Sequence, residues 1–288
     1  MKKKLSIFLY NTFRFFVNKL PAGAGRYLGK FIALLGYLIT PKRRKRVLSN
    51  LKKALDLSDE QAKKTIKEVY QNLGYNFAEF LQEDQLSRAQ IEDIVDFEGL
   101  DYLDQALKKE KGVIIYTAHL GNWELMGTAL SRRGYSIDAI AREQNDSTFD
   151  EKINEIRKNS GIGIIPKGIA VRKVFKSLKK NSSVVVLGDQ DAREHGWKLQ
   201  FFGRDASTYP GAVQFAKRTG APIVPVFIHR RGWLKHELKC YPPRYIDPEA
   251  EKEELKSELQ DLLKLTEEEI LKKPADWMWL HKRWKTYS

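Results

Sequence analysis

The feature that most restricts the fold of this chain is a series of short, continuous apolar runs in its second half. Each run has the length of a buried strand and is rich in Val and Ile, and segments with helical spacing separate most of the runs. The predicted strands are residues 112–117, 136–141, 161–166, 183–188, 222–228 and 237–241. The predicted helices are residues 99–110, 122–132, 147–159, 168–180, 210–219 and 250–272. This alternation predicts an α/β fold, with a mostly parallel central sheet covered by helices on both faces.

The basic residues are concentrated at the N-terminus. The chain has a net charge of +14, and residues 1–50 contain twelve Lys or Arg and no acidic residue. Two apolar stretches lie there, 6–20 and 25–40, but charged residues interrupt both, so neither reaches the roughly 18–20 apolar residues of a spanning helix. No small-residue cleavage site follows the first stretch, so we expect no removed signal peptide.

Amphipathic segments of this kind, flanked by lysine and arginine, are typical of proteins that bind an anionic membrane surface. The alternative is a nucleic-acid-binding arm, but Phe, Leu and Ile interleaved in helical spacing favour lipid. We therefore expect residues 1–40 to be membrane-associated amphipathic helices, either peripheral or forming a single anchor, with no nucleic-acid partner.

The rest of the chain is expected to form one unit, residues 41–288. It comprises a helical lead-in at 41–90 and an α/β catalytic core at 91–288. Cys240 is the single cysteine of the chain, so no internal disulfide is possible, which fits a reducing compartment.

A histidine and a glutamate, His119 and Glu124, lie where the first strong strand gives way to a helix. Asn122 is a good N-cap, so the helix is expected to begin after it and to leave His119 on the loop beyond the strand's carboxyl end. Ligands bind at that edge in open α/β sheets. We expect Glu124 to accept a hydrogen bond from one imidazole nitrogen and to leave the other as a general base.

The spacing has an ordinary explanation as well. In a chain with 37 acidic residues, a carboxylate five positions after a histidine arises readily by chance. A glutamate in the first turn of a helix is also a common stabilising residue.

Several further blocks join HLGNWE (119–124) in a recognisable order. They are AREQNDSTFDEKINEIRKNSG (141–161), GDQD (188–191), FFGRDAST (201–208), TGAPIVPVFIHRR (219–231) and PADWMWLHKRWK (274–285). Together they cover about residues 90–288, and the chain resembles the bacterial lipid A biosynthesis acyltransferases of the lysophospholipid acyltransferase superfamily.

The resemblance implies transfer of a fatty acyl chain from an acyl thioester, carried by acyl carrier protein or CoA, to a hydroxyl of a membrane glycolipid such as a lipid A precursor. His119 and Glu124 would form the catalytic pair. A cell inner membrane location, at the cytoplasmic face, follows from the same resemblance. The family needs no cofactor. Asp189 and Asp191 have a DxD spacing that suits Mg²⁺, but no His or Cys cluster supports a metal site.

The blocks also suggest substrate-binding residues. Arg142 is a candidate phosphate clamp or oxyanion donor, and an ordinary surface arginine is its alternative. Asp189 and Asp191 are expected to pair with an arginine, such as Arg142 or Arg204, or to orient acceptor hydroxyls. Phe201 and Phe202 are expected to line an acyl channel or to belong to the core. Asn122 and Arg204 complete the candidate set.

Three other functions remain open at this stage. The same fold acylates other acceptors, such as a phosphatidylinositol mannoside or an aminolipid. It also supports a thioesterase or other hydrolase, in which His119 activates water. A non-catalytic membrane-binding protein is the third, although intact His119, Glu124, Arg142 and Asp191 argue against it.

Overall fold

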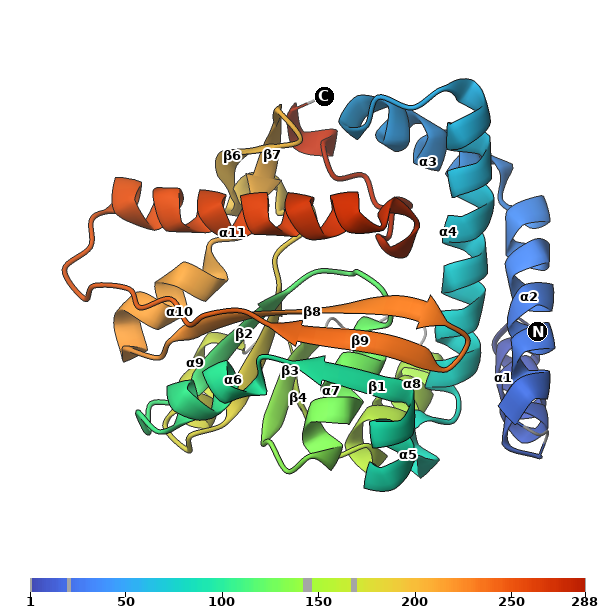
Figure 1. Ribbon diagram of the computed structural model, residues 1–288, viewed down its shortest axis with the longest axis horizontal. Helices are drawn as coiled ribbons and strands as arrows, with labels where there is room; N and C mark the ends of the chain where they lie inside the picture. The colour runs from blue at the N-terminus through green and yellow to red at the C-terminus, as the bar shows by residue number, and fades with distance from the viewer. Residues whose placement is uncertain (1, 20–21, 142–146, 167–169, 288) are drawn as a thin grey trace.

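The fold is a central sheet with helices on both faces and a group of helices at one end (Figure 1). The computed structural model describes residues 2–19, 22–141, 147–166 and 170–287. Its helices are α1 (Lys2–Lys19), α2 (Ala22–Ile39), α3 (Pro41–Ala54), α4 (Asp59–Phe80), α5 (Arg88–Ile94), α6 (Leu100–Leu107), α7 (Trp123–Arg132), α8 (Ser147–Asn159), α9 (Ala170–Leu178), α10 (Gly211–Thr219) and α11 (Lys252–Lys272). Its strands are β1 (Val95–Glu98), β2 (Val113–Thr117), β3 (Ile137–Ala141), β4 (Ile162–Pro166), β5 (Ser183–Leu187), β6 (Trp197–Phe201), β7 (Arg204–Thr208), β8 (Ile223–Gly232) and β9 (Lys235–Cys240).

Across the described residues the main sheet has seven strands in the order β1-β9-β8-β2-β5-β3-β4. The strands from β8 to β4 are all parallel to their neighbours, whereas β9 is antiparallel to β8 and parallel to β1. The mostly parallel α/β sheet expected from the sequence is therefore confirmed.

The strand β2 shows why the central strands are apolar throughout. Ile114 and Tyr116 face one core, which they share with α9, α10 and α11. Val113 and Ile115 face the other core, beneath α5, α6 and α7. Because successive side chains of a strand point to opposite faces, a strand covered on both sides needs an apolar residue at every position.

Three strands were not predicted. β1 is short, and β6 and β7 form a separate antiparallel hairpin. Polar residues such as Lys198 and Gln200 alternate with apolar residues in β6, which is the pattern of a strand covered on one face and not the continuous apolar run on which the prediction of strands relied. The hairpin turns through Phe202 and Gly203, both of which have positive φ.

Helices α2 and α4 lie side by side near the carboxyl end of β8 (Figure 1). Their close approach depends on a glycine: a Cβ on Gly74 of α4 would lie 2.3 Å from the carbonyl oxygen of Gly29 on α2 and 2.8 Å from the Ala33 Cβ. A real Cβ does not approach a backbone oxygen so closely, so the two helices would have to separate.

We expect Gly74→Ala to lower the free energy of unfolding by about 1–3 kcal/mol, because the added methyl overpacks a backbone contact. Urea unfolding in detergent measures the change. Gly36→Ala is the matched control, since a Cβ there meets the Tyr70 ring at an ordinary 3.7 Å. Equal stabilities for the two variants would contradict the close packing of α2 on α4.

Candidate active site

Two neighbouring parallel strands bring a histidine and an aspartate together. β2 and β5 pair with Thr117 opposite Leu187. His119 and Asp189 each follow two positions beyond these partners. Both side chains therefore emerge at the same point on the carboxyl edge of the sheet, and His119 Nδ1 lies 2.8 Å from Asp189 Oδ1.

Donors surround the Asp189 carboxylate, which is 2% exposed. Its Oδ2 accepts the main-chain N–H of His119 at 3.1 Å and the indole N–H of Trp277 at 2.8 Å. Burial raises the pKa of Asp189, but the adjacent His119 and these donors outweigh burial and lower the pKa to about 2. An ionised carboxylate can only accept, so the hydrogen-bond pattern assigns the imidazole proton to Nδ1 and leaves the lone pair of Nε2 available.

The prediction of a hydrogen bond between His119 and Glu124 is wrong. Both Glu124 oxygens accept from the guanidinium of Arg157 on α8, at 2.6 and 2.9 Å. Glu124 is the second residue of α7, and His119 precedes the Asn122 cap, so the turn of the chain directs their side chains to different neighbours. The structure therefore shows an ion pair between Glu124 and Arg157 in place of the predicted contact with His119.

The predicted partner of Asp189 also differs from the observed one. Asp189 was expected to pair with an arginine or to orient acceptor hydroxyls, and its oxygens are instead used by His119 and Trp277. Arg204, one of the proposed arginines, is exposed at the start of β7. Arg142, the other, lies outside the described residues.

Asn122 has a supporting position rather than one open to substrate. Its side chain caps α7 by accepting the N–H of Leu125 at 3.2 Å, and its amide donates to Glu79 at 2.8 Å and to Glu83 at 3.3 Å. The residue is 1% exposed. All its polar atoms are therefore engaged in holding the start of α7.

A buried charged network from α4 supports the same loop. The guanidinium of Arg230 on β8 donates two hydrogen bonds to the Glu79 carboxylate, at 2.5 and 2.6 Å, and one to Asn76 at 2.6 Å. Asn76 in turn donates to the carbonyl of Gly121 at 2.5 Å. Burial raises the pKa of Glu79, but the charge of Arg230 outweighs burial and holds the pKa well below the usual range.

Glu83, one turn further along, has the opposite character. It lies next to Asn122 and receives a 3.2 Å hydrogen bond from Thr128. Burial, together with the charges of Glu124 and Glu79, raises its pKa well above the ordinary value. The surroundings of Glu83, beneath the loop that carries His119, therefore favour the protonated form of its carboxyl group over the ionised form. The sequence signal for this network is weak: Glu79 stands among apolar residues in FAEFL, but Glu83 lies in the polar run QEDQ.

The C-terminal segment, residues 273–287 after α11, contacts the loop between β2 and α7 from the other side. Met278 N–H donates to the carbonyl of His119 at 3.0 Å, and the Gly121 N–H donates to the carbonyl of Asp276 at 2.9 Å. Gly121 has φ 57°, and a Cβ there would lie 2.0 Å from the carbonyl oxygen of Ile228. Glycine is therefore required at this position.

The other proposed residues lie further from His119 or in the core. Asp191 is half-buried and accepts from Thr286 at 2.7 Å, and its N–H donates to His281 at 2.9 Å. Burial lowers the pKa of His281 to about 4, which agrees with its accepting role. Phe201 is fully buried against Trp277 and Trp284, which matches the core alternative, and Phe202 is half-buried beside Trp279.

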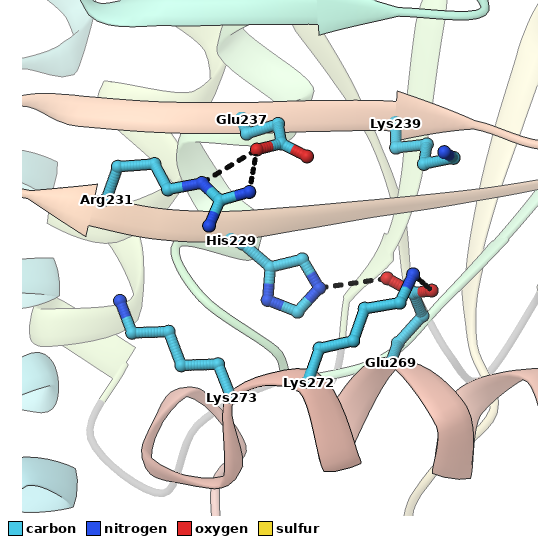
Figure 2. Close-up of a pocket in the computed structure, with 7 residues that line it drawn as sticks. All are labelled: His229, Arg231, Glu237, Lys239, Glu269, Lys272 and Lys273. Atoms are coloured by element: carbon cyan, nitrogen blue, oxygen red, sulfur yellow. Dashed lines mark hydrogen bonds and ion pairs between the residues drawn. The ribbon is translucent and has the colours of Figure 1, made fainter.

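A cavity of about 90 Å³ lies away from His119, on the side of β8 that faces the end of α11 (Figure 2). Basic side chains enter it, but each already has an acidic partner or a carbonyl. Arg231 binds Glu237, Lys272 binds Glu269 at 2.5 Å, and Lys273 donates to the carbonyl of Arg230. His229 donates its Nε2–H to the Glu269 carboxylate at 2.9 Å. This local balance of charge does not favour a catalytic centre there.

Within the described ranges, no group of three or more His, Cys, Asp or Glu side chains is arranged to hold a metal ion. In the same part of the chain, no helix is long and apolar enough to cross a membrane.

The sequence profile of the bacterial lipid A biosynthesis acyltransferases matches residues 1–286. The chain belongs to this family. Its relatives act on more than one kind of acceptor, to judge from their names.

The phosphatidylinositol mannoside acyltransferase of Mycobacterium tuberculosis is 26% identical over 192 residues, which are 65% of this chain and 58% of that protein. The lipid A biosynthesis palmitoleoyltransferase of Escherichia coli is 24% identical over 238 residues, covering 80% of this chain and 74% of the relative. The lipid A biosynthesis lauroyltransferase of the same species is 22% identical and covers 94% and 88%.

Among solved structures, the 1-acyl-sn-glycerophosphate acyltransferase of Thermotoga maritima is 17% identical, with a TM-score of 0.39, and the match covers 85% of this chain and 97% of that one. A likeness of that level has no bearing on the site.

We expect Glu83→Gln to stabilise this member of the family, and more so at high pH. A carboxyl group with a raised folded-state pKa takes up a proton on folding once the pH exceeds the ordinary carboxyl range, so folding becomes less favourable as the pH rises. A neutral amide removes that dependence. The gain in unfolding free energy at pH 7.5 should exceed the gain at pH 4 by about 1 kcal/mol or more.

Urea unfolding at both pH values measures this difference. Glu68→Gln, at an exposed position of α4, is the matched acid-to-amide control and should show no such pH dependence. A pH-independent effect of Glu83→Gln would mean that Glu83 is ionised in the folded protein.

Proposed function

We propose that this chain is a membrane-associated O-acyltransferase. It moves a fatty acyl group from an acyl thioester, on acyl carrier protein or CoA, to a hydroxyl of a lipid A precursor or a similar envelope glycolipid. Support comes from the His119–Asp189 pair, whose Nε2 remains available at the carboxyl edge of the sheet, in a chain of this family. A glycolipid acceptor is the chemistry that the names of its lipid A and phosphatidylinositol mannoside relatives share.

The acceptor hydroxyl needs a base because its own pKa lies far above neutrality. Nε2 of His119 takes the hydroxyl proton as the oxygen attacks the thioester carbonyl. The ionised Asp189 stabilises the imidazolium that forms. When the tetrahedral intermediate collapses, the carbon–sulfur bond breaks and the imidazolium returns its proton to the leaving thiolate. The chain has no G-x-S-x-G motif, so direct transfer without an acyl-enzyme is favoured.

The tetrahedral intermediate requires hydrogen-bond donors for its oxyanion. The N–H of Gly121 already donates to the carbonyl of Asp276, so it does not serve the oxyanion. The N–H groups of Trp123 and Glu124 begin α7 and have no acceptor in their own helix. They follow His119 closely along the chain and are the favoured donors.

Membrane attachment at the cytoplasmic face of the inner membrane is proposed to use α2. One side of this helix exposes large apolar residues at helical spacing: Tyr27, Phe31, Leu34, Leu35 and Leu38. Its opposite side packs on α4 through Gly29 and Ala33. The basic cluster Lys42–Arg46 follows at the start of α3. An exposed apolar face beside basic residues matches an anionic bilayer surface.

The identity of the acceptor is tested by mass spectrometry of membrane lipids from cells with and without this protein. A new acyl chain on a lipid A precursor supports the proposal. An added acyl chain on a phosphatidylinositol mannoside or an aminolipid would support the alternative acceptors. Release of free fatty acid without transfer would support a thioesterase.

Substitution of Asp189 and of Glu124 should lower the rate of acyl transfer to very different extents. His119→Ala and Asp189→Asn should each lower kcat/KM for acyl transfer by about 10²–10⁴-fold, since one removes the base and the other removes the charge that supports it. Glu124→Gln, the matched acid-to-amide control, should lower it less than about tenfold, because Glu124 binds Arg157. A larger loss in Glu124→Gln than in Asp189→Asn would restore Glu124 as the partner of His119.

The membrane surface is tested with the double variant Phe31→Ser/Leu38→Ser. Binding to anionic phosphatidylglycerol vesicles should weaken at least tenfold, since each side chain contributes about 1.5–3 kcal/mol on burial in apolar surroundings. Co-sedimentation in 1 M salt, where the screening length is about 3 Å, isolates this apolar part. Val171→Ser/Leu271→Ser is the control, because both residues are exposed on other helices. Equal binding by the two double variants would exclude α2 as the anchor.

A further inference from the structure

The side-chain amide of Gln190 lies against the imidazole ring of His119. Its Nε2 is 3.2 Å from His119 Nε2 and 3.4 Å from His119 Nδ1. A donor in line with the lone pair of one ring nitrogen would be much farther from the other nitrogen. Nearly equal distances therefore place the amide over the ring, out of line with both lone pairs. The in-plane position at Nε2 stays open.

The main chain of Gln190 and Asp191 is hydrogen-bonded to the C-terminal segment. The carbonyl of Gln190 accepts from Arg283 at 3.2 Å, and the next N–H, that of Asp191, donates to His281. Arg283 is itself fully buried and donates to the carbonyl of Ser207 at 2.5 Å. The Gln190 side chain thus projects from a fixed backbone toward His119.

The imidazole needs such a contact for its orientation. Asp189 holds Nδ1, but one hydrogen bond leaves the ring free to tilt about that point. Trp123 adds an edge contact, with ring centroids 5.1 Å apart and an interplanar angle of 64°. A proton transfer from a bound hydroxyl requires the Nε2 lone pair to point at it, so the plane of the ring has to be fixed.

We infer that Gln190 is a positioning residue for His119, one that holds the plane of the imidazole so that Nε2 faces the acceptor hydroxyl. The inference rests on the proposed acyl transfer for its catalytic part. The sequence around Gln190 fits this role, because an amide stands between two acids in GDQD. An amide orients the ring without adding charge, whereas a carboxylate there would stabilise the imidazolium and weaken the base.

The charged and titratable groups that interact with His119 come from two other segments. Asp189 follows β5 and binds Nδ1, and the charge of His119 acts on His281 of the C-terminal segment. Neither group changes in a Gln190 variant. A shift in the titration of His119 in such a variant therefore reports the Gln190 contact itself.

Two variants test the inference. Gln190→Glu keeps the shape and adds a negative charge, so the acidic limb of the kcat/KM–pH profile should move up by about one pH unit or more. In the full chain without substrate, the titration midpoint of the His119 Cε1–H signal, assigned by its loss in His119→Ala, should move in the same direction. Gln190→Met keeps the volume and removes the amide, and should lower kcat about tenfold or more with little change in KM.

The matched control is Gln105→Glu, which makes the same charge change at an exposed position of α6. It should leave both the pH profile and the His119 midpoint unchanged. An unmoved midpoint in Gln190→Glu, or an unchanged kcat in Gln190→Met, overturns the inference. The NMR titration needs no acyl transfer, so a wild-type chain that transfers no acyl group would refute the proposed function separately from the contact.

Discussion

The parallel pairing of β2 with β5 is the contact on which the candidate site depends. Each strand ends in a short loop, and the register sets the two loops side by side at the carboxyl edge. A shift of the register by one residue would turn every side chain of a strand to the opposite face. The apolar residues that fill both cores therefore also fix the position of His119 against Asp189.

The loop between β2 and α7 is held from parts of the chain far apart in sequence. Asn76 and Glu79 reach it from α4 and are bound in turn by Arg230 of β8, and Asp276 reaches it from the segment after α11. Several of these groups are charged and buried, where an unpaired charge would be strongly destabilising. Their mutual pairing fixes the position of the loop that carries His119. The lead-in helices are thus part of the support of the site, whatever else they contact.

The two acids near His119 show how position decides role. Asp189 is buried, surrounded by donors and held ionised with a pKa of about 2. Glu124, at the start of α7, is partly exposed and neutralised by Arg157. Both were candidates from the sequence, because each lies beside a turn at a strand or helix end. Only the first contacts the imidazole, because it follows β5, which pairs with β2, whereas Glu124 on α7 binds Arg157.

The sequence by itself determined the features that arise from local physics. Continuous apolar runs predicted the central strands, Asn122 predicted the start of α7, and the strand-to-helix junction predicted that His119 lies on an edge loop. Tertiary structure alone decided that Asp189 contacts His119, that Arg157 takes Glu124, and that Phe201 belongs to the core. These contacts join residues 33 or 70 positions apart, and they depend on strand order and helix packing. Local periodicity reports which face of an element is buried, but it carries no information on which other element covers that face.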